Sequence, residues 1–87
     1  MKVIMKNIDV IAWFEQTKGP IPLKFRIKNK DESQTIIKID KICFQKKEKL
    51  AGNPMIIFTC QSLINNVLTK YEIRYEINTC KWYLYKI

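Results

Sequence analysis

The chain has 87 residues, 47% of them hydrophobic, which is enough apolar content for one folded domain, 1–87, and too much for a disordered chain. Lys and Arg number 16 against 8 Asp and Glu, so the net charge is +8 at pH 7. There is no His, which excludes Ser-His and Cys-His catalysis and His-based metal sites.

Period-2 alternation and an excess of β-branched and aromatic residues predict strands throughout, and no window has a helical period. Six strands are expected, at about 8–16, 22–28, 34–44, 54–63, 67–77 and 81–86. The connections are short, so consecutive strands should pair antiparallel. The predicted fold is all-β: a six-strand antiparallel meander curled into a small, partly open SH3-like barrel.

The first two strands are expected to turn at Lys18-Gly19. Their inner pairs would be Phe14 with Leu23, Ala12 with Phe25 and Val10 with Ile27, and their outer pairs Asp9 with Lys28, Ile11 with Arg26 and Trp13 with Lys24. This register buries one face and leaves cations beside apolar residues on the other.

The third strand changes parity, because Ile37 and Ile39 fit one face whereas Ile42 and Phe44 fit the other. A β-bulge at Asp40-Lys41 would restore the pattern. The break that follows, QKKEKLAGN, could hold one helical turn at 46–50 that ends at Gly52.

The cross-strand register is best defined by the sequence for the last three strands. Asn65-Asn66 suits a type I′ turn, which sets Phe58 against Ile73, Cys60 against Tyr71 and Ile56 against Tyr75. An even-length loop after 67–77 sets Tyr75 against Trp82, Ile73 against Leu84, Arg74 against Tyr83 and Glu72 against Tyr85.

The outer face carries more apolar residues than a solvated sheet needs: Ile11, Trp13, Ile36, Met55, Ile57, Leu63, Leu68, Tyr83 and Tyr85. Two interpretations remain open for the tyrosines. They cover the stems of charged neighbours such as Arg74, or they form a binding surface. The N-terminal MKVIM, the segment 45–53 or another copy of the chain is expected to cover part of this face.

The charge and these rings predict the function. Single-stranded nucleic acid is bound by cations that contact phosphates and by aromatic faces on which bases stack. The candidate nucleic-acid-binding residues fall in two patches: Trp13, Lys24, Arg26, Lys28 and Lys38; and Arg74, Tyr83 and Tyr85. The same excess of Lys, Ile and Asn also follows from AT-rich coding, so the charge has a purely compositional explanation as well.

We therefore expect a small, basic, non-enzymatic binding module, whose partner is nucleic acid or an acidic protein. The alternative is an interaction or structural subunit that forms a homodimer through its outer apolar face or its edge strands. No catalytic residue, metal site or cofactor is expected: the acidic residues are scattered, and two glycines cannot form a phosphate-binding loop.

The three cysteines, Cys43, Cys60 and Cys80, have no CxxC spacing and are predicted to be buried free thiols. The N-terminal apolar run is too short for a signal peptide and no segment could span a membrane, which predicts a cytoplasmic protein. TCKWYLYKI at 79–87, AWF at 12–14 and KLAGNPMIIFTCQS at 49–62 resemble short uncharacterised proteins of low-GC Gram-positive bacteria and their mobile elements. This resemblance implies a small all-β domain and no known activity.

Overall fold

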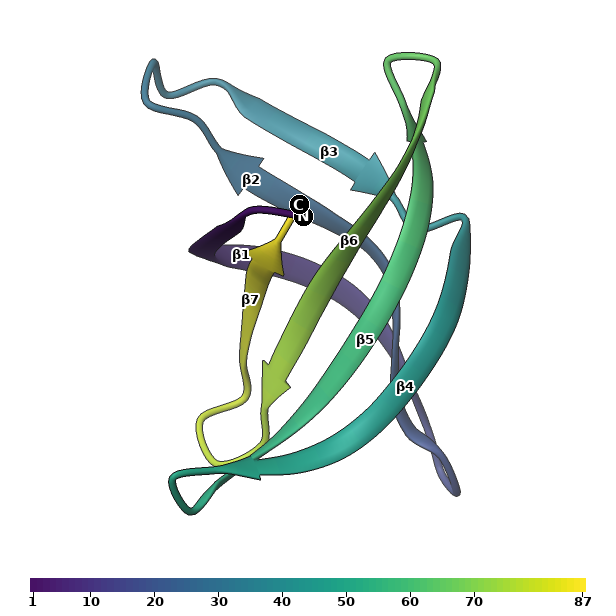
Figure 1. Cartoon of the computed structure of the whole chain (residues 1–87), viewed down its shortest axis with the longest axis vertical. Helices are drawn as coiled ribbons and strands as arrows, with labels where there is room; N and C mark the ends of the chain where they lie inside the picture. The colour runs from purple at the N-terminus through teal and green to yellow at the C-terminus, as the bar shows by residue number, and fades with distance from the viewer.

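The computed structural model describes all residues, 1–87, as antiparallel strands without a helix. There are seven strands rather than six: β1 (Val3–Glu15), β2 (Gly19–Lys28), β3 (Gln34–Lys38), β4 (Lys41–Leu50), β5 (Asn53–Ile64), β6 (Val67–Glu76) and β7 (Lys81–Lys86). They form one sheet that curls into a half-barrel, which confirms the predicted all-β, partly open architecture (Figure 1).

The strand order is β3-β2-β1-β7-β6-β5-β4, so the first and last strands pair at the centre and β3 and β4 form the two edges. The chain ends lie side by side (Figure 1), where Lys2 and Ile87 donate backbone hydrogen bonds to each other at 2.7 and 3.0 Å. The pairing of β1 with β7 thereby joins the two halves of the chain into one sheet, and the half-barrel is open between the edge strands β3 and β4.

The predicted strand 34–44 is two strands, separated at Ile39 and Asp40. A corner replaces the expected bulge, and the chain crosses there from one edge of the sheet to the other. The corner is fixed by the Ile39 N–H, which donates to the carbonyl of Leu23 at 2.9 Å, and by Ser62 Oγ, which donates to the carbonyl of Lys38 at 2.7 Å. Past it, Ile42 packs on the core but Phe44 is exposed, contrary to the expected inward position.

The prediction of a helical turn at 46–50 is wrong. Lys46 to Leu50 continue β4 and pair with Ile57 to Asn53 of β5. Ala51 and Gly52 form the two-residue turn, with φ of 51° and 82°, the left-handed conformation that a type I′ hairpin requires. Successive lysines point to alternate faces of the strand but are all polar. The sequence therefore shows no apolar–polar alternation there, and the strand could not be recognised.

The registers predicted for the last three strands are confirmed. Phe58 lies opposite Ile73 and Tyr75 opposite Trp82, and both Asn65 and Asn66 have positive φ. One pair is wrong: a bulge between Glu72 and Ile73 sets Glu72 opposite Lys86 instead of Tyr85.

The predicted register of β1 and β2 is wrong by two residues from Asp9 to Ile11 and by three residues beyond the bulge. Val10 lies opposite Phe25 and Ala12 opposite Pro22, with Leu23 extra at a bulge. The turn is therefore Gln16–Lys18 rather than Lys18-Gly19. A slip of two keeps each side chain on its face, but it leaves Phe14 and Leu23, both expected in the core, exposed.

The core joins both walls of the half-barrel. Its twelve buried residues are Ile8, Phe25, Ile37, Ile39, Ile56, Phe58, Cys60, Tyr71, Ile73, Tyr75, Trp82 and Leu84. Cys60 is buried as predicted, whereas Cys43 and Cys80 are exposed, and all three are free thiols. The structure contains no helix of the length and apolarity needed to span a membrane.

Candidate nucleic-acid interface

The outer side of β1, β2 and β3 carries most of the predicted site. Phe25 faces the core between its partners Val10 and Ile37, so its neighbours in β2 point outward. We call this surface the basic face and define it by seven outward residues: Ile11, Trp13, Lys24, Arg26, Lys28, Ile36 and Lys38.

Pairing across the three strands orders the basic face in rows. Ile11, Lys24 and Lys38 form one row, and Arg26 with Ile36 lies in the next. A shallow groove of about 280 Å³ runs between these rows and is lined by Asp9, Val10, Ile11, Lys24, Phe25, Arg26 and Ile36. Apolar and cationic side chains therefore meet along one depression.

The charge of the basic face is mostly unneutralised. Arg26 donates to Asp9 Oδ2 from Nε at 3.1 Å and from Nη2 at 2.9 Å, in an exposed ion pair. Lys24, Lys28 and Lys38 take part in no ion pair, and β2 and β3 contain no acidic residue. Three cations are therefore free to contact an external anion.

Trp13 stands at the end of the basic face and is 65% exposed. Its cross-strand partner is Ile21 rather than the predicted Lys24. A ring held on a strand and left in water is available for stacking, which is the second requirement of a single-strand binding surface.

The second predicted patch is engaged within the chain. The Arg74 side chain donates from Nε to Glu72 Oε2 at 2.7 Å, and its guanidinium carbon lies 3.4 Å from the centre of the Tyr85 ring. Only 13% of either charged side chain is exposed. Tyr83, opposite Arg74, donates to Glu76 Oε1 at 3.5 Å, and burial raises its pKa. We call Glu72, Arg74 and Tyr85 the Arg74 cluster.

The structure thus brings five of the eight predicted residues together on the basic face and places the other three beyond β1, on β7 and β6. Arg74 stacks on Tyr85 rather than on Tyr83. These contacts agree with the interpretation in which the rings cover a charged neighbour's stem.

Two of the apolar residues expected on the outer face are covered by the chain itself. Met55 and Ile57 are buried, and their cross-strand neighbours are Glu48 and Glu76 for Met55 and Lys46 and Arg74 for Ile57. Segment 45–53 lies beside these residues, mostly as β4 of the same sheet, so its side chains flank this part of the face. The N-terminal residues pair with β7 instead. Trp13, Ile11 and Ile36 keep their exposure on the basic face.

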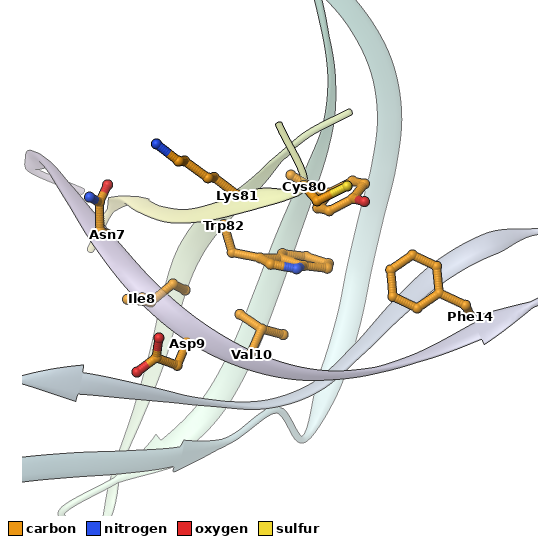
Figure 2. Close-up of a pocket in the computed structure, with 9 residues that line it drawn as sticks. Asn7, Ile8, Asp9, Val10, Phe14, Cys80, Lys81 and Trp82 are labelled. Atoms are coloured by element: carbon orange, nitrogen blue, oxygen red, sulfur yellow. The ribbon is translucent and has the colours of Figure 1, made fainter. Parts of the chain in front are cut away.

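Sequence reasoning missed a cleft of about 830 Å³ at the end of the half-barrel. It is lined by the apolar residues Ile8, Val10, Phe14, Tyr75 and Trp82 and bordered by Asn7, Asp9, Cys80 and Lys81 (Figure 2). We call it the aromatic cleft. It exists because β1 pairs with β7 only up to Ile8, beyond which β1 continues with β2 alone. Nothing local in the sequence signals this, because it depends on where two distant strands part.

Comparison with protein-family models, with curated proteins and with solved structures gives no significant match.

Proposed function

We propose that the protein binds single-stranded nucleic acid along the basic face. The observation that supports this best is the set of unpaired lysines, Lys24, Lys28 and Lys38, beside the exposed ring of Trp13 on one three-strand surface. Phosphates would contact the lysines, and bases would lie against Trp13, Ile11 and Ile36.

A single strand fits this surface better than a duplex does. The face is a shallow groove on a sheet rather than a projecting helix or ribbon that could enter a major groove. Its apolar residues need bases whose faces are free, which only an unpaired strand offers.

Self-association through the edges is less well supported. β4 is the longer edge strand and carries Lys41, Lys46, Lys47 and Lys49, and lysines on an edge discourage pairing with a second copy. The apolar residues that prompted this alternative are partly covered within the chain, at Met55 and Ile57.

The test is the salt dependence of binding to a fluorescent single-stranded oligonucleotide. Wild type is compared with Lys24→Ala/Lys38→Ala on the basic face and with Lys46→Ala/Lys49→Ala on β4, which has the same net charge. Each lost phosphate contact reduces the slope of log K against log salt by about 0.7. We expect a reduction of about 1.4 in the basic-face variant and no change in the β4 variant.

Two results would overturn the proposal. One is an absence of binding by wild type at low salt. The other is an equal loss in the two double variants, which would mean that net charge rather than the basic face determines binding.

A further inference from the structure

The aromatic cleft holds three rings from three strands around one opening. The Phe14 and Tyr75 ring centres lie 6.0 Å apart, nearly perpendicular, and those of Tyr75 and Trp82 lie 4.6 Å apart. Phe14 is 62% exposed although it points to the core side of β1, because no strand pairs with this part of β1 on the side of β7. Figure 2 shows its ring across the opening from the Trp82 indole, with Val10 pointing from β1 toward Trp82.

The cleft and the groove of the basic face share a wall. Asp9 and Val10 line both, since they lie in β1 with successive side chains on opposite sides of the strand (Figure 2). From Asp9 to Phe14, β1 has no strand partner on the side away from β2. A polymer that follows the basic face can therefore pass over this free edge of β1 into the cleft.

From this geometry we infer that the aromatic cleft receives one unstacked base of the nucleic-acid strand that the basic face binds, an inference that rests on the proposed function. A base is flat, so one of its faces can stack on the exposed Phe14 ring, next to the buried Tyr75 and Trp82 rings. Asn7 and Lys81 border the cleft with their side chains on the outer side of the sheet, where they can contact the sugar-phosphate of that nucleotide. The cations of the basic face, with Lys81 beside the cleft, favour an anionic chain over a neutral ligand.

The test uses oligonucleotide binding by Phe14→Ala, with Phe44→Ala as the matched control. Both phenylalanines are exposed strand residues, at 62% and 57%, but Phe44 lies on β4 away from the cleft. Losing one base–ring contact lowers affinity by about tenfold. We expect that loss in Phe14→Ala with an unchanged salt slope, and wild-type affinity in Phe44→Ala.

A second readout locates the base. The chain has two tryptophans, so Trp13→Phe leaves Trp82 as the only one and keeps a ring on the basic face. We expect the oligonucleotide to quench Trp82 emission in this variant, and an oligonucleotide of the same length made only of abasic sugar-phosphate to leave it unchanged.

The outcomes separate the two proposals. The cleft inference is wrong, while basic-face binding stands, if Phe14→Ala binds as wild type does. The same holds if the oligonucleotide and its abasic counterpart have the same effect on Trp82 emission. Quenching of Trp82 by an extended acidic peptide but not by the oligonucleotide would assign the cleft to a protein strand and also overturn the inference. If wild type binds no oligonucleotide at low salt, both proposals fail.

Discussion

The guanidinium carbon of Arg74 lies 3.4 Å from the ring centre of Tyr85, while Nε of the same side chain donates to Glu72 at 2.7 Å. An arginine held in this way has its charge neutralised and its flat face covered. The most conspicuous cation–aromatic pair of the protein is therefore a stabilising contact of the β6–β7 surface, whereas Lys24, Lys28 and Lys38 of the basic face remain free.

Arg74→Ala should consequently reduce stability and spare binding. Removing a cation–π contact and a charge-assisted hydrogen bond that are largely shielded from water should cost about 1–3 kcal/mol. Urea melts measure this cost, and oligonucleotide titration of the folded variant measures binding. A folded Arg74→Ala protein with strongly reduced affinity would show that the Arg74 cluster belongs to the interface.

Truncation of the neighbouring β7 residues Trp82 and Tyr83 should reduce the free energy of unfolding by very different amounts. Trp82 is buried against Tyr75 and Phe58, so Trp82→Ala should cost about 3–5 kcal/mol, much of the stability of a small domain. Tyr83 is half-buried on the outer side, and Tyr83→Ala should cost about 1 kcal/mol or less. Equal destabilisation in urea melts would contradict this assignment of faces.

The hydroxyl groups of Tyr71 and Ser62 should be coupled in stability. Ser62 Oγ donates to the carbonyl of Lys38 at 2.7 Å, so the Tyr71 hydroxyl donates to Ser62 at 2.5 Å. Ser62→Ala leaves a buried hydroxyl and the carbonyl of the β3–β4 corner unpaired and should cost about 1–3 kcal/mol, while Tyr71→Phe should cost about 1 kcal/mol. The double variant should lose less than the sum of the two. Additive losses would mean that the two hydroxyls act independently.

Thiol reactivity should separate the three cysteines. Burial raises the pKa of Cys60 to about 12, so this thiol stays protonated and shielded in the folded protein. Cys43 and Cys80 are exposed. A disulfide reagent at neutral pH should modify Cys43 and Cys80 and reach Cys60 only after denaturation. Rapid native modification of Cys60, identified by mass spectrometry, would contradict the buried position.

The hairpins of the C-terminal half were predictable because their local signals agree. Asn65-Asn66 specifies a tight turn, and the pairs that follow from it, such as Phe58 with Ile73, are apolar on one side only. In the N-terminal half the local signals mislead. Pro20 and Pro22 lie inside β2, and the bulge at Leu23 shifts a register that counting from Lys18-Gly19 cannot find.

The candidate site, too, was predictable from the sequence only in part. Trp13, Lys24, Arg26, Lys28 and Lys38 could be grouped from the sequence because a slip of two residues preserves the face of a strand. The Arg74 cluster could not be separated from them, since its ion pair with Glu72 and its stacking on Tyr85 depend on side-chain conformation and on the bulge at Tyr85 in β7. The aromatic cleft depends on the pairing of β1 with β7, which lie at opposite ends of the chain.

The most direct test of the account is a titration of the isotope-labelled protein with a single-stranded oligonucleotide, followed by amide and indole chemical shifts. We expect the shift changes to gather on β1, β2 and β3, with the Trp13 indole and the amides around Lys24 and Lys38 among the largest, and with the Trp82 indole responding from the aromatic cleft. The Arg74 cluster and β4 should change little. Changes centred on Lys46 to Lys49 or on Arg74 and Tyr85, or no change at all, would contradict the assignment of the basic face as a nucleic-acid-binding surface.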